Sequence, residues 1–229
     1  MTQGSRRVAL ATGVLGVAAI AVALGFAMLP KVIEAGDCFA PTSVLEFEFA
    51  TDKRDLKRIF DSAGGVCREK ARSAVDQANL LDVFGFIPAY TALNIMAVVF
   101  LAGGWRRSPL AVLASGAAVL AAVADYVETI NLLAITKVLD TGGEAMLAIS
   151  TPAAITKFVL LGVHGLATAA ICLFTSPRRP ILGLALALPP AVTALLVNDP
   201  RANYALWAAA VFIAYGSLTL AAFWKAARS

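Results

Sequence analysis

Six long apolar segments divide this chain of 229 residues and limit what it can fold into. Each is close to the length of about 20 residues that an α-helix needs to cross a hydrocarbon core about 30 Å thick. Only 15% of the residues are charged, a composition too apolar for an ordinary soluble domain. The segments are 8–29, 81–101, 109–138, 153–175, 181–197 and 204–224. The sequence therefore predicts an all-α integral membrane protein with about six transmembrane helices.

Basic residues gather on one side of the predicted helices. Short loops that carry Lys and Arg stay in the cytoplasm, so this bias orients the chain. The residues on this side are Arg6, Arg7, Arg106, Arg107, Arg178, Arg179, Lys225 and Arg228. We expect both termini in the cytoplasm and residues 31–79 outside it, in a bacterial cytoplasmic (inner) membrane. The net charge of +4 is explained by this orientation signal, and no nucleic-acid partner is expected.

The first apolar segment has two interpretations. Its length exceeds the 7 to 15 apolar residues or so of a secretory signal, which favours a retained anchor. Cleavage after the small residues near Gly25 and Ala27 is the alternative, and it would leave five helices. With the anchor retained, the predicted organisation is an N-terminal transmembrane anchor (1–30), a small extracytoplasmic cap between helices 1 and 2 (31–79), and a five-helix transmembrane bundle (80–229).

Within the cap, Leu45, Phe47 and Phe49 alternate with Glu46 and Glu48. Strict alternation of apolar and polar residues is typical of a half-buried β-strand. The pattern therefore predicts a short strand or extended piece here.

Helices are predicted on the C-terminal side of that piece. Asp52 is a suitable N-cap for a helix that runs through Phe60 and ends at Gly64 and Gly65. A second helix is predicted from Val66, unbroken into the second span, where Pro88 should kink it.

Two of the three cysteines bracket the cap. In an oxidising external compartment, Cys38 and Cys67 are expected to form a structural disulfide bond. Closing a loop of this length stabilises a fold by about 3 to 4 kcal/mol in the chain-entropy model. Cys172 lies inside the fourth span, where a cysteine is expected to fill space as a small apolar residue.

Ionisable side chains inside the apolar segments are the most distinctive chemical feature of the chain. A charged carboxylate near a bilayer centre costs about 2.5 to 3.5 kcal/mol on insertion scales, so it normally faces a protein interior or a wet cavity. Asp125 and Glu128, both near the middle of the third span, are the candidate catalytic residues. The candidate ligand-binding residues are Asp82, Tyr90, Asn94, Asp125, Glu128, Asn131, Lys157 and His164.

Other kinds of site receive little support. A single histidine argues against bis-histidine haem and against the zinc sites of membrane hydrolases, so no metal site is predicted. The pattern D-x-x-E is weak evidence for a divalent cation. No cofactor can be assigned from the sequence.

Three stretches of the chain resemble a group of uncharacterised bacterial multi-pass membrane proteins. They are Phe47-Glu48-Phe49-Ala50, the run from Leu81-Asp82 to Phe86-Ile87-Pro88-Ala89-Tyr90, and the D-x-x-E of Asp125 and Glu128. The resemblance covers about the first 140 residues. It implies a multi-pass membrane protein and brings no activity with it.

Four functional interpretations follow from these residues. The first is a protein that binds a lipid-like or small amphiphilic molecule at an acidic intramembrane pocket, alone, as a homo-oligomer, or as an accessory subunit of a membrane complex. The second is a membrane enzyme on a lipid or isoprenoid, with Asp125 or Glu128 as acid or base. A small proton-coupled transporter is the third, suggested by the proline-containing second and fifth spans. In the fourth, Asp125 pairs with Lys157 or His164 as a purely structural clasp.

Overall fold

The computed structural model describes residues 3–39, 43–61, 65–103, 108–175 and 179–228. Within these ranges the chain is helical, without a β-strand, and six helices are long and apolar enough to cross a membrane. The prediction of an all-α protein with six spans is therefore confirmed. The long helices are α1 (Gln3–Gly25), α6 (Ile87–Ala102), α7 (Pro109–Lys137), α8 (Leu147–Phe174), α9 (Pro180–Asn198) and α10 (Pro200–Ala227).

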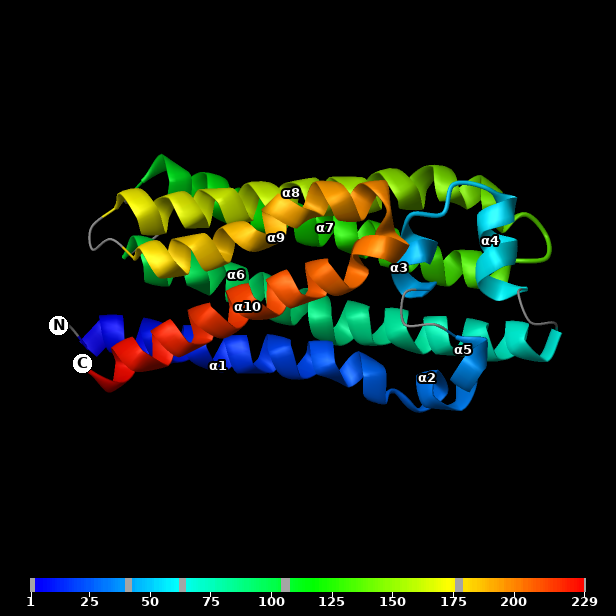
Figure 1. Ribbon diagram of the computed structural model, residues 1–229, viewed down its shortest axis with the longest axis horizontal. Helices are drawn as coiled ribbons and strands as arrows, with labels where there is room; N and C mark the ends of the chain where they lie inside the picture. Colours follow the sequence, from blue (N-terminus) through cyan, green and yellow to red (C-terminus); the bar gives the residue numbers. More distant parts are fainter. Residues whose placement is uncertain (1–2, 40–42, 62–64, 104–107, 176–178, 229) are drawn as a thin grey trace.

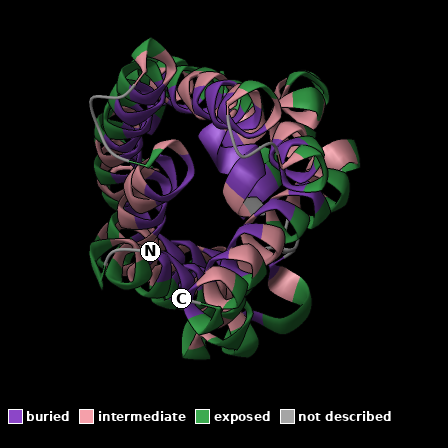
Figure 2. Ribbon diagram, turned by 90° about the vertical axis from the view of Figure 1, so that its left-hand side faces the viewer, coloured by how far each residue is buried: buried purple, intermediate pink, exposed green. Residues whose placement is uncertain are grey.

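The six long helices form a closed ring. Each packs against two neighbours in the order α1, α6, α7, α8, α9, α10, and α10 returns to α1. Figure 2, viewed along the helices, shows this arrangement. Both chain ends lie at the same end of the bundle, opposite the cap (Figure 1), as an even number of crossings requires.

Small residues allow the ring to close between α1 and α10. Gly13 faces the ring of Phe223, and Gly16 faces Thr219 so closely that an added Cβ would overlap the threonine hydroxyl. In a membrane, such small residues let two helix backbones approach and gain van der Waals contact.

The second span is the end of a longer helix. Helix α5 (Gly65–Leu81) continues through a π-helical turn (Asp82–Phe86) into α6, which confirms the predicted unbroken helix. The π turn ends two residues before Pro88, the residue that lacks an N–H donor, and the kink expected at Pro88 stays a prediction. The whole run has 38 residues. At about 1.5 Å per residue it far exceeds a hydrocarbon core about 30 Å thick, so α5 extends out to the cap.

The cap consists of short helices that pack on α5, on one another and on the long helices beside them. The short helices are α2 (Pro30–Ala35), η2 (Gly36–Cys38), α3 (Ser43–Glu48) and α4 (Lys53–Phe60). Their core joins Phe47 and Phe60, whose ring centroids are 5.2 Å apart, to Val75 of α5 and Leu132 of α7. The predicted disulfide bond between Cys38 and Cys67 is present and connects η2 to the first turn of α5.

The predicted strand at residues 45–49 is wrong, because this piece is the helix α3. Alternation had suggested one buried and one solvated face, but Leu45, Phe47 and both glutamates are buried. The glutamates are buried because each has a basic partner: Glu46 lies 3.6 Å from Arg58, and Glu48 lies 2.9 Å from Lys157.

Helix α4 begins after its predicted N-cap and runs through Phe60, as predicted. The side chain of Asp52 accepts hydrogen bonds from the backbone N–H groups of Arg54 and Asp55, which confirms the N-cap. A side-chain hydrogen bond from Arg54 also holds the pKa of Asp52 below its ordinary value. Of the two glycines expected to follow the end of this helix, Gly65 opens α5 and Gly64 lies outside the described residues.

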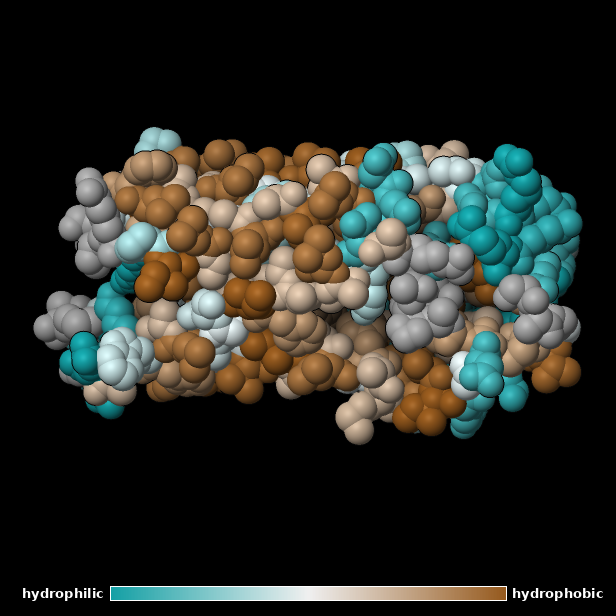
Figure 3. Space-filling model, viewed as in Figure 1, coloured by the Kyte–Doolittle hydropathy of each residue, from teal (hydrophilic) through white to brown (hydrophobic). Residues whose placement is uncertain are grey.

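The surface agrees with a membrane-spanning bundle. Apolar side chains cover the bundle, and hydrophilic ones gather over the cap (Figure 3). At the end that carries the termini, Arg179 lies 4.8 Å and Lys225 lies 5.5 Å from the ring of Phe100. The predicted basic residues Arg106, Arg107 and Arg178 lie outside the described residues.

Candidate functional site

Lys157 of α8 is the centre of a buried ionic cluster. Its ammonium group lies 2.9 Å from Glu48 of α3, 3.1 Å from Asp125 of α7 and 2.8 Å from Glu128 of α7. The side chains of all four residues are less than a tenth exposed. One lysine therefore connects two membrane helices and the cap.

Neighbouring polar groups extend this cluster toward α6 and the π turn. The hydroxyl of Tyr90 donates to Asp125 over 2.8 Å, and the hydroxyl of Thr129 donates to Asp82 over 3.1 Å. Asp125 and Glu128 are three residues apart on α7, which brings both to the same side of that helix. Below, the acidic cluster means Glu48, Asp82, Asp125, Glu128 and Lys157.

The acidic cluster has more acids than bases. Three buried carboxyl groups surround one ammonium group, and the half-buried carboxyl group of Asp82 lines the same cavity. Removing charges from water is costly unless they are paired, and here three carboxyl groups share a single cation. The site therefore favours further positive charge, as protons or as a cationic group.

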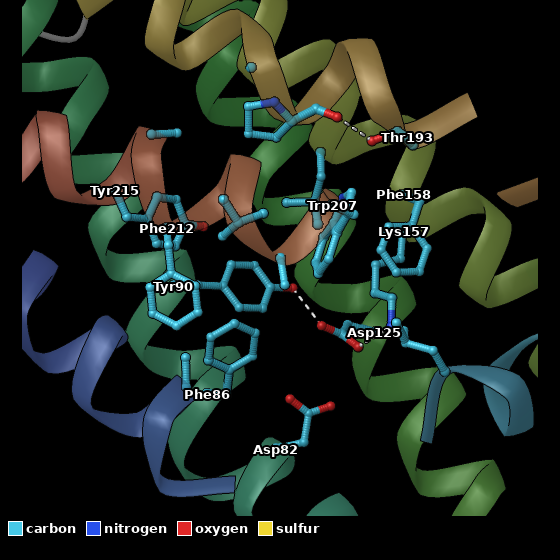
Figure 4. Close-up of a pocket in the computed structure, with 18 of the residues that line it drawn as sticks. Asp82, Phe86, Tyr90, Asp125, Lys157, Phe158, Thr193, Trp207, Phe212 and Tyr215 are labelled. Carbon is cyan, nitrogen blue, oxygen red and sulfur yellow. Dashed lines mark hydrogen bonds and ion pairs between the residues drawn. The ribbon is translucent and has the colours of Figure 1, made fainter. Parts of the chain in front are cut away.

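A cavity of about 390 Å³ lies beside the acidic cluster, inside the ring of helices. Glu48, Asp82, Asp125 and Lys157 line one end of it, whereas Glu128 is not among its lining residues. Figure 4 shows Asp82 and Asp125 reaching toward the space that Phe86 and Tyr90 border. Aromatic residues make up much of the remaining wall: Phe26, Phe86, Tyr90, Phe158, Trp207, Phe212 and Tyr215.

The cavity occupies one part of the ring, and packed side chains fill another. Toward the cap it is lined by Val32, Phe39 and Leu45. Toward the termini a core of apolar side chains from all six long helices follows, including Phe100, Ile171 and further buried residues. The cavity is thus a pocket beneath the cap, and the packed core forms its floor.

The structure brings five of the eight candidate ligand-binding residues together in one cluster. Asp82, Tyr90, Asp125, Glu128 and Lys157 lie together. Of the two alternatives for the partner of Asp125, the structure has Lys157.

Three candidates lie apart from the cluster. Asn94 and His164 line the cavity, but the Nδ1 of His164 is 3.0 Å from the carbonyl oxygen of Ala114, to which it donates. Asn131 is not among the cavity-lining residues, and its amide donates instead to the carbonyl of Met146 and the hydroxyl of Ser150.

Glu48 was missed as a site residue. It belongs to the cap and reaches Lys157, which is 109 residues away in the chain. A usable signal was present, because a glutamate between Phe47 and Phe49 is unusual for a solvated surface. Phe158 and Trp207, whose ring centroids are 5.4 Å apart on the cavity wall, carried no comparable signal.

A metal site finds no support in the part of the chain that is described. No group of three or more His, Cys, Asp or Glu side chains there is arranged to hold a metal ion. No family model matches the chain, and no curated protein or solved structure matches it either.

Proposed function

We propose that this protein binds a lipid-like or small amphiphilic molecule in the cavity beneath the cap. The polar head lies at the acidic cluster, and the apolar part lies along the aromatic wall. The observation that carries this proposal is the combination of one charged end and an apolar wall in a single pocket of about 390 Å³. Ligand pockets are typically about 300 to 1,000 Å³, largely apolar, with a few polar groups that fix orientation.

The proposed setting is the cytoplasmic membrane of a bacterium, with both termini in the cytoplasm and the cap outside. The basic residues near the chain ends, such as Arg6, Arg7 and Lys225, support this orientation because short basic segments stay inside. The protein acts in the bilayer alone, as a homo-oligomer or as an accessory subunit of a membrane complex. Fusion of alkaline phosphatase within the cap should be active, and a fluorescent protein at the C-terminus should fold.

Native mass spectrometry and lipid extraction of protein purified in a mild detergent test the binding proposal. Ala208 lines the cavity, whereas the adjacent Ala209 is exposed. Ala208→Phe should therefore fill the pocket, and Ala209→Phe is its matched control. We expect a stoichiometric small molecule in the wild type and in Ala209→Phe, lost from Ala208→Phe without a change in thermal stability.

Two other outcomes would support a different interpretation of the site. An empty wild type, together with an Asp125→Asn/Glu128→Gln variant that only melts earlier, would contradict binding and indicate the structural clasp. A bound molecule that differs chemically from the molecule supplied would instead indicate the second candidate, an enzyme. Asp125 favours that candidate, because it lines the cavity and accepts a hydrogen bond from Tyr90.

A further inference from the structure

We propose that the head group bound in this cavity is cationic, an amine or quaternary ammonium on an apolar chain, and that Asp82 is the carboxylate that meets it. This inference rests on the proposed function and specifies its ligand. Four observations carry it: the three carboxyl groups that surround Lys157, the position of Asp82 without a basic partner among the described residues, an unpartnered amide nitrogen at Asn79, and the aromatic faces beside them.

The surroundings of Lys157 disfavour an anionic head group. An ammonium group has three donors. Three carboxyl groups, from Glu48, Asp125 and Glu128, lie within 3.1 Å of its nitrogen. A phosphate or carboxylate would have to displace one of them and would add negative charge to a buried site that is already rich in acids.

Asp82 is the carboxyl group of the acidic cluster that remains for a ligand. Among the described residues, no basic side chain lies within ion-pairing distance of it, and it accepts a hydrogen bond from the hydroxyl of Thr129. It lines the cavity, and Figure 4 shows its carboxylate directed into the open space below Tyr90. A cation here would pair with Asp82 and offset the excess of acidic groups.

Asn79 points to a ligand independently of the charges. It lines the cavity with only 3% of its surface exposed, and its amide nitrogen has no hydrogen-bond partner among the described residues. More than nine in ten buried polar groups in proteins are paired. Asn79 precedes Asp82 by three residues, so an amine with a neighbouring hydroxyl or ester oxygen would satisfy both side chains.

The π turn presents Asp82 beside aromatic rings. A π turn takes more residues than an α turn, which keeps Asp82, Phe86 and Tyr90, at intervals of four, on one face. The rings of Phe86 and Tyr90 have centroids 5.3 Å apart, and Phe26 lies 5.8 Å from Phe86. Aromatic faces attract desolvated cations, quaternary ammonium groups above all.

The test compares amphiphiles with one tail and different heads. Wild-type protein is kept in a sterol-based non-ionic detergent and titrated with dodecylamine, dodecyltrimethylammonium, dodecyl maltoside and dodecyl phosphate. Binding of each probe is measured by native mass spectrometry. We expect the two cationic probes to bind at least about tenfold more tightly than the other two. Asp82→Asn should lower cation affinity by about tenfold while Glu69→Gln, an exposed carboxyl on the same long helix, leaves it unchanged.

The possible results separate the two proposals. Equal or tighter binding of dodecyl phosphate or the maltoside, still blocked by Ala208→Phe, would overturn the cationic head group and leave the binding function standing. Binding of no probe, with no native molecule retained, would overturn the binding function itself. If Asp82→Asn fails to fold, the head-group preference of the wild-type protein still tests the proposal of a cationic ligand.

Discussion

Lys157 illustrates, at the scale of single residues, why a buried ion needs its partners. The three carboxyl groups around it come from two α7 positions and from the cap. The attraction within such a cluster offsets the cost of removing its charges from water. Loss of the one cation would leave the carboxyl groups facing each other.

Lys157→Met therefore has a definite expected effect. Methionine fills similar space without charge, and breaking a buried ion pair typically costs about 3 to 5 kcal/mol. We expect a loss of stability in that range, measured by chemical unfolding in detergent. Lys137→Met, at an exposed lysine near the end of α7, is the control and should change stability little. Equal stability of the two variants would mean that the cluster contributes nothing to the fold.

The sequence allowed only part of the site to be predicted at this scale. Asp125, Glu128 and Lys157 could be identified because an ionisable residue in an apolar span is itself a signal. The position of Glu48 between two phenylalanines was a signal of burial, but its pairing with Lys157 could not be predicted, because the two residues are 109 positions apart and only the folded cap brings them together. Asn131 was grouped with Asp125 although six residues of α-helix turn about 240°, which directs it to Met146 and Ser150.

At the scale of individual elements, the long helices could be predicted from the sequence, whereas the short helix α3 could not. The long spans were predictable because about 20 apolar residues leave few alternatives. The short helix α3 was not, because its alternation spans only a few residues and both of its glutamates are buried in ion pairs. The closure of α1 on α10 also needed the structure, since small residues occur throughout this chain.

Gly16→Ala tests that closure. The new Cβ would overlap the hydroxyl of Thr219 and lie 3.1 Å from its Cβ, so Thr219 or the two helices would have to shift apart. Overpacking of this kind typically costs about 1 to 3 kcal/mol. The control is Gly116→Ala in α7, where nothing lies within 4 Å of the added Cβ. It should gain about 0.5 to 1 kcal/mol from helix propensity alone. If both substitutions changed the free energy of unfolding in the same direction, close contact between α1 and α10 would be contradicted.

At the scale of the whole molecule, the ring of helices and the cap complete one pocket. Hydropathy predicted the six crossings but not their order around a ring, because neighbours in the ring such as α1 and α10 are far apart in sequence. The cap contributes Glu48 to the cluster and Phe39 to the cavity wall. It is fastened to α8 by Glu48 and by the hydroxyl of Thr151, which donates to the carbonyl of Ala50.

The disulfide bond should therefore affect binding as well as stability. Cys38 and Cys67 are 29 positions apart, and a cross-link of that span is worth about 3 to 4 kcal/mol in the chain-entropy model. We expect Cys38→Ser/Cys67→Ser to become sensitive to proteolysis within residues 31–79. It should also bind the amphiphile less tightly, because a cap that opens removes Glu48 from Lys157. Cys172→Ala, which changes a buried cysteine outside the bond, is the control. A double variant that loses cap protection yet keeps full affinity would show that the ring alone forms the binding site.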